Sequence, residues 1–114
     1  MSSDVVFIAR SRFGKQIRLT ETIWHEKIRR EHAEFAHRGE YLEEIRKAVE
    51  DPEIIVEGWS RELLALRLCE IAPKSPKYLC VVYRELNDEG FVITAFFISR
   101  VEKLLRRPVR WRRT

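Results

Sequence analysis

The clearest strands of the sequence lie in Tyr78–Ser99, YLCVVYRELNDEGFVITAFFIS. Its two halves, Tyr78–Leu86 and Phe91–Ser99, are rich in the β-branched and aromatic residues that favour strands. The residues between them, Asn87-Asp88-Glu89-Gly90, have the composition and length of a hairpin loop. The sequence therefore predicts an antiparallel strand pair, which needs further strands and a helical layer to cover it.

The helical layer is expected before this hairpin. A first helix is predicted from Thr20, which can cap it, to Phe35 or His37. Its apolar residues recur with helical spacing and form one narrow core-facing stripe, which comprises Trp24, Ile28 and Phe35.

A second helix is predicted over Glu40–Glu50, because Pro52 pushes the residue before it out of the helical region. The inner face of this helix consists of Tyr41, Leu42, Ile45, Ala48 and Val49. The short connection favours packing of the two helices as a hairpin.

Shorter strands are expected at Asp4–Arg10, Lys15–Thr20 and Ile54–Val56. Leu63–Ile71 fits both helical and strand periods, and its neighbours favour a strand. These elements together predict an α+β fold, in which an N-terminal helical pair packs on an antiparallel four- to five-stranded sheet. Residues 1–105 would form a single domain, and residues 106–114 a basic C-terminal tail.

Composition narrows the class of protein. With 114 residues, 45% hydrophobic and 35% charged, the chain is expected to be one globular domain without a membrane span. No signal peptide is recognised, so a cytoplasmic location and two reduced cysteines, Cys69 and Cys80, are expected. The net charge of +4 is unevenly placed, because residues 99–114 carry +6 and the other 98 residues carry −2.

Several polar residues are candidates for a site. On an α-helical wheel His25 and His32 fall within about 20° of each other, at the edge of the buried stripe, with Arg29 slightly further round. Thr94 has the one hydrogen-bonding side chain between Phe91 and Ile98, so its hydroxyl needs a partner or a ligand. Arg84 ends its strand on an otherwise apolar face, which favours an anionic partner. The simpler alternatives are half-buried helix-edge histidines, a hydrogen-bonded core threonine and an arginine at the rim of the sheet.

The order of these residues resembles a known family. IWHEKIRREHAEF, YLEEIRKAVEDPEII, YLCVVY and GFVITAFF together resemble the phage-type nuclease domains of the barnase–EndoU–colicin–RelE-like (BECR) fold, over Leu19–Ser99. Carried over, the matching residues are His25, His32 with Glu34, Asp51-Pro52, and Thr94. The chain departs from the family pattern at two positions. Glu31 stands where the family has arginine, with Arg30 one place earlier, and Ala33 stands where the family has proline.

The resemblance implies a small toxin-like ribonuclease, and the residues independently fit such chemistry. Cleavage of RNA without a metal needs a base for the 2′-hydroxyl, an acid for the 5′-oxygen and cations for the phosphate. His25 and His32 would divide the acid–base work, Arg29 or Arg84 would bind phosphate, and Thr94 would orient the scissile group. No cofactor or metal site is expected, since zinc-type Cys/His spacing and acidic clusters are lacking.

Two other classes of function stay open. The domain could be a non-catalytic RNA-binding module, or a protein-interaction domain that docks on an acidic partner such as an antitoxin or immunity protein. The basic tail supports each of them, because Arg106, Arg107 and Arg110 alternate with Trp111 in a pattern suited to phosphate contact and base stacking. A solubilising terminus is the simpler interpretation. If the tail binds RNA, its deletion is expected to weaken binding without loss of the fold.

Overall fold

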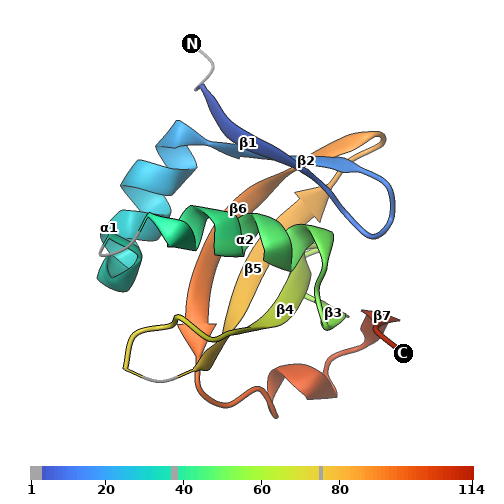
Figure 1. The fold of residues 1–114 in the computed structure, drawn as a ribbon. Helices are drawn as coiled ribbons and strands as arrows, with labels where there is room; N and C mark the ends of the chain where they lie inside the picture. Colours follow the sequence, from blue (N-terminus) through green and yellow to red (C-terminus); the bar gives the residue numbers. More distant parts are fainter. Residues whose placement is uncertain (1–3, 37–38, 75) are drawn as a thin grey trace.

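A computed structural model of the chain describes residues 4–36, 39–74 and 76–114. Their main feature is a seven-stranded sheet with the order β1-β2-β6-β5-β4-β3-β7 (Figure 1). Neighbouring strands are antiparallel except β2 and β6, which pair in parallel. The strands are β1 (Val5–Arg10), β2 (Gln16–Thr20), β3 (Ile54–Glu57), β4 (Leu63–Cys69), β5 (Lys77–Glu85), β6 (Glu89–Ile98) and β7 (Val109–Arg112).

The predicted fold class is therefore wrong. Strands β1 to β6 were expected and β7 was not; the sheet is mixed and larger than four or five strands, because two segments join it through distant partners. Strand β2 pairs with the beginning of β6, where Gln16 lies opposite Glu89. Strand β7 pairs with β3 at the other edge, where Trp111 lies opposite Ile55. Hydrophobic periodicity reports a strand but carries no information on its partner.

The first helical segment is shorter and less regular than predicted. It consists of a π-helix η1 (Ile23–Ile28), one turn of α-helix α1 (Arg29–Glu31) and a 3₁₀-helix η2 (Ala33–Ala36). The α-helical turn ends at His32, whose φ of −130° and ψ of 83° are not helical. The expected alternative end at His37 lies outside the described residues. Because a π-helix has a wider turn than an α-helix, the α-helical wheel that aligned His25 with His32 does not apply.

The apolar stripe of this segment is nevertheless confirmed. Trp24, Ile28 and Phe35 are all buried. The rings of Trp24 and Phe35 meet edge to face, and Phe35 stacks on Phe97 of β6 with 4.7 Å between ring centroids. Strand β2 covers β6 only over residues 89–91, so this segment lies along the next part of β6.

Helix α2 (Glu40–Glu50) is confirmed at the predicted residues. Tyr41, Ile45, Ala48 and Val49 are buried, and Leu42 is half-buried against them. The expected helical hairpin is wrong, because α2 lies across one face of the sheet and contacts β1, β4 and β5 instead (Figure 1).

The opposite face of the sheet carries a second apolar cluster, which consists of Ile54, Val56, Leu64, Leu66, Cys80 and Val82. The chain after β6 crosses this face, and Leu104 in the 3₁₀-helix η3 (Leu104–Arg106) packs on it. This crossing leads to β7, so residues 106–114 include part of the sheet rather than a separate tail (Figure 1). Deleting them would remove an edge strand, contrary to the expectation that the fold is independent of them.

Candidate functional site

His25 and Arg29 form a pair on the helical segment. His25 is exposed, and its Nδ1 lies 2.9 Å from Nη1 of Arg29. A guanidinium only donates hydrogen bonds, so Nδ1 of His25 accepts and a neutral ring carries its proton on Nε2. Arg29 also lies 5.9 Å from the ring centroid of Trp24. The two predicted site residues are thus in direct contact.

His32 lies at the break after the α-helical turn. It is half-buried, and its ring centroid lies 6.0 Å from that of Phe96 on β6. Its backbone N–H donates to the carbonyl oxygen of Ile28, which fixes the break at the end of the helix. The histidine therefore reaches the second face of the sheet, where Phe96 packs against the apolar cluster.

Thr94 lies two residues before Phe96 on the same strand. It pairs with Val82 next to a bulge, because Tyr83 pairs with Val92 and Ile93 has no opposite residue. Its Oγ1 is buried and lacks a hydrogen-bond partner among the described residues. A buried hydroxyl without a partner is costly, which is the condition that the sequence predicted for a ligand-binding threonine.

Arg84 is half-buried near the end of β5 and lies opposite Phe91. It lies two positions after Val82, the partner of Thr94, so the alternation of the strand places its side chain on the face of Thr94. The structure thus places Arg84, Thr94 and the ring of His32 along one side of the β5–β6 pair. The pair of His25 and Arg29 lies on the neighbouring helical segment.

A second buried hydroxyl was not anticipated. The hydroxyl of Tyr83 also lacks a partner among the described residues, and its ring is fully buried. Burial raises the pKa of Tyr83 above the ordinary value of a tyrosine, and Glu85 adds to this shift while Arg110 opposes it. The sequence indicated only that Tyr83 faces away from Arg84, as a core residue or a stacking surface.

The basic residues of the C-terminal segment have structural contacts. Arg107 donates from Nε to the carbonyl oxygen of Glu57 at 2.5 Å and from Nη2 to that of Gly58 at 2.6 Å. Arg110 lies 3.7 Å from a carboxylate oxygen of Glu57, whereas Arg106 is exposed.

Trp111 is not the free stacking surface that the sequence suggested. It is half-buried against the core, and the guanidinium of Arg12 lies over its ring at 4.6 Å.

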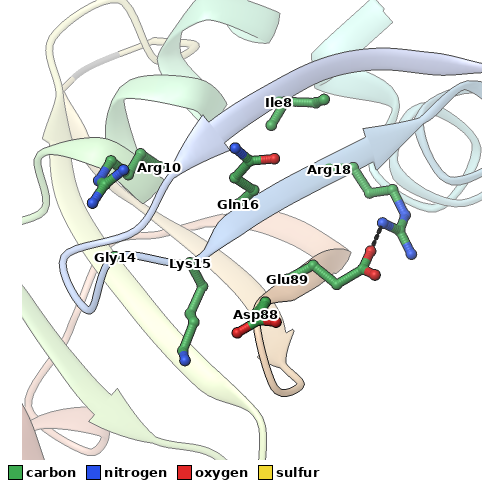
Figure 2. Close-up of a pocket in the computed structure, with 8 residues that line it drawn as sticks. All are labelled: Ile8, Arg10, Gly14, Lys15, Gln16, Arg18, Asp88 and Glu89. Atoms are coloured by element: carbon green, nitrogen blue, oxygen red, sulfur yellow. Dashed lines mark hydrogen bonds and ion pairs between the residues drawn. The ribbon is translucent and has the colours of Figure 1, made fainter.

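Figure 2 shows the cavity at the β1–β2 hairpin, whose volume is about 500 Å³. Its lining contains both cations and anions. Arg18 pairs with Glu89, and Nζ of Lys15 donates to the carbonyl oxygen of Asn87. Arg10 and Asp88 also face this cavity. These residues were not singled out by the sequence, which showed only the polar positions of an alternating strand. None of the predicted site residues lines this cavity.

Within the described ranges, no group of three or more His, Cys, Asp or Glu side chains could hold a metal ion. The helices of the same residues are too short or too polar to cross a membrane. Comparisons with protein-family models, curated proteins and solved structures give no match.

Proposed function

We propose that this protein is a metal-independent endoribonuclease, toxin-like in its biological role. The observation that carries the proposal is the position of His32, whose ring lies against Phe96, two residues from Thr94, whose buried hydroxyl has no hydrogen-bond partner among the described residues. An imidazole and a buried hydroxyl at the same part of one strand are suited to a polar substrate group, such as a ribose or phosphate oxygen. Arg84, on the same face of the sheet, is the predicted cation of strand β5.

The reaction is a transesterification within the RNA chain. His32 accepts the proton of the 2′-hydroxyl while the 2′-oxygen bonds to phosphorus, and the bond from phosphorus to the 5′-oxygen breaks. The 5′-oxygen takes a proton from the imidazolium of His25. The products are a 2′,3′-cyclic phosphate and a 5′-hydroxyl; exchange with water removes the proton from His32 and supplies one to His25 for the next turnover.

The pair of His25 and Arg29 gives this scheme a specific order. While Arg29 donates to Nδ1 of His25, that nitrogen cannot carry a proton. When a phosphate draws Arg29 away, Nδ1 becomes free to accept a proton and His25 becomes a general acid. Arg29 then stabilises the charge that develops on the phosphate. Substrate binding would thereby produce the acid that the reaction needs.

The test is cleavage of bulk RNA in excess chelator by the wild type and by His32→Ala. We expect the wild type to cleave and to leave 2′,3′-cyclic phosphate ends, and His32→Ala to be at least about 100-fold slower. Thr94→Val keeps the shape of the side chain without its hydroxyl and should also be slower. Lys47→Ala removes an exposed charge from α2 and serves as the control. Equal cleavage by wild type and His32→Ala, or none by either, would refute the assignment.

A non-catalytic RNA-binding module is the second candidate. It is favoured by the contacts of His25 with Arg29 and of His32 with Phe96, which also suit structural side chains. Under this alternative, His32→Ala would bind RNA like the wild type and neither protein would cleave it.

The toxin role makes a separate prediction, which involves an antitoxin or immunity protein as partner. Expression of the wild type alone should arrest growth, and expression of His32→Ala should not. Co-expression of the neighbouring gene product should relieve the arrest. Growth arrest by both proteins would argue for a protein-interaction domain instead.

A further inference from the structure

Three segments that are distant in the sequence meet at β7 and bring arginines onto aromatic rings. Arg107 lies over Trp59 of the β3–β4 loop at 4.7 Å, and Arg110 lies over Phe13 of the β1–β2 loop at 5.8 Å. Arg110 and Arg61 line one hollow of about 380 Å³ together with Trp59, Gly58 and the carboxylates Glu57 and Glu62. We call these five residues, Phe13, Trp59, Arg61, Arg107 and Arg110, the arginine–aromatic surface.

Trp59 is the most accessible aromatic ring of this surface. It is 64% exposed, compared with 37% for Phe13. Arg107 covers it from one side, and the two hydrogen bonds of Arg107 to the carbonyl oxygens of Glu57 and Gly58 fix that guanidinium. An exposed indole that is held in place loses little conformational entropy when a flat partner stacks on it.

The loop that carries Trp59 is held in a defined conformation. Glu62 accepts from the backbone N–H of Ser60, and this hydrogen bond contributes most to lowering the pKa of Glu62, so its carboxylate is charged and committed to the loop. The backbone N–H of Gly58 donates to the carbonyl oxygen of Glu62 at 2.7 Å. Arg61 has a φ of 69°, a left-handed conformation that is unfavourable for a residue with a Cβ. The loop thus keeps an exposed arginine where glycine would be less strained.

The cations around Trp59 divide into two kinds. Arg107 is half-buried and occupied by backbone carbonyls, so it positions the ring. Arg61 is exposed, and the side chain of Arg110 is 50% exposed, with a carboxylate oxygen of Glu57 3.7 Å from its Nη1. Arg61 and Arg110 therefore remain accessible to an anion at the hollow that they share with the indole.

We infer that the arginine–aromatic surface binds single-stranded RNA, with a base stacked on Trp59 and phosphates on Arg61 and Arg110. The inference rests on the proposed function in naming RNA, and it assigns the stacking role to Trp59 in place of Trp111. A duplex hides the faces of its bases, so an exposed indole favours an unpaired strand. An acidic protein would need the arginines but would make no specific use of the indole face.

The test uses a short fluorescent oligonucleotide of 2′-O-methyl uridine, which binds like RNA but lacks the 2′-hydroxyl that cleavage requires. Trp59→Ala should weaken its binding roughly 5- to 100-fold, since stacking on an aromatic side chain is worth that much for each base. Trp59→Phe should retain most of the affinity, because it keeps an aromatic face. Arg61→Ala and Arg110→Ala should each lower the slope of log K against log salt by about 0.7. Arg100→Ala, which removes an exposed cation elsewhere, is the control and should change the slope less.

The outcomes separate this inference from the catalytic proposal. Binding that depends on Trp59 supports the surface whether or not His32→Ala abolishes cleavage, because the oligonucleotide cannot be cleaved. Wild-type affinity of a folded Trp59→Ala protein, or no binding at low salt, would overturn the inference. It would also be overturned if polyglutamate displaced the oligonucleotide equally well from the wild type and from Trp59→Ala, since the surface would then serve an acidic protein.

Discussion

Arg107→Ala should destabilise the fold, because Arg107 connects the C-terminal segment to the end of β3. The substitution removes two hydrogen bonds from a charged donor to the carbonyl oxygens of Glu57 and Gly58. Such bonds contribute about 1.5–3 kcal/mol each when buried, and the half-buried position of Arg107 reduces this value. The contact with Trp59 adds roughly 0.5–1 kcal/mol. We therefore expect a loss of about 2–3 kcal/mol in the free energy of unfolding.

Urea denaturation followed by tryptophan fluorescence measures this loss. Arg107→Lys should recover less than half of it, since an ammonium group cannot donate to both carbonyls in the planar geometry of a guanidinium. Arg106→Ala is the matched control, because Arg106 is the exposed neighbour, and it should change stability by at most about 0.5 kcal/mol. If Arg107→Ala were as stable as Arg106→Ala while binding RNA more weakly, the structural role of Arg107 would be refuted and its predicted role as an RNA contact supported.

Two further predictions concern the sheet. In Gly90→Ala the new Cβ would overlap the carbonyl oxygen of Arg84 and lie 2.8 Å from Cδ1 of Ile17, so thermal unfolding should show a loss of stability of about 1–3 kcal/mol or more. The control is Gly39→Ala, which should be neutral because nothing lies within 4 Å of its new Cβ. Equal melting temperatures of the two variants would contradict the β5–β6 packing. Burial raises the pKa of Cys80 from 9.0 to about 12, so the unfolded chain ionises first as the pH rises. The contribution of Cys80 to stability is therefore complete below about pH 9 and is lost between pH 9 and 12. Urea titrations across this range should show a smaller loss for Cys80→Ala, and a native thiol that reacts rapidly with a thiol reagent at pH 8 would contradict the burial.

The parts of the fold that depend on local sequence were predictable. Helix α2 begins and ends where the apolar period and Pro52 place it, and the β5–β6 hairpin follows from its two strand-like runs and the turn between them. Burial of Trp24, Ile28 and Phe35 also followed from spacing, even though the helix is of a different type. Trp24 and Ile28 are four positions apart, a spacing that keeps two residues on nearly the same side of both kinds of helix, so the pattern does not distinguish them.

The pairings between distant segments were not predictable in the same way. Nothing in Gln16–Thr20 indicates that its partner is the first part of β6, or that the partnership is parallel. Residues 109–112 alternate cations with apolar residues, and this pattern suited an exposed nucleic-acid contact as well as an edge strand. Which of the two forms depends on the free edge of β3, and this edge exists only in the folded molecule.

The candidate site shows the same division. The solitary hydroxyl of Thr94 in an apolar strand was visible in the sequence, and the structure leaves it without a partner among the described residues. The contact of His25 with Arg29 follows from a spacing of four residues, but the contact of His32 with Phe96 depends on the break that ends α1. Trp59 had no sequence signal, because one tryptophan in a polar loop becomes a surface only when Arg107 reaches it.

The parallel pairing of β2 with β6 also constrains the order in which the protein can fold during synthesis. Of these strands the β1–β2 hairpin emerges from the ribosome first, yet its place in the sheet requires β6, and the outer edge of β3 stays unpaired until β7 is made. Such pairings between distant segments slow folding, because the entropy of closing a long loop is lost before any contact compensates for it. Until β6 is synthesised, Phe96 and Thr94 are absent and His32 has no sheet to contact. A nascent chain therefore carries His25 and His32 long before it can assemble the proposed site.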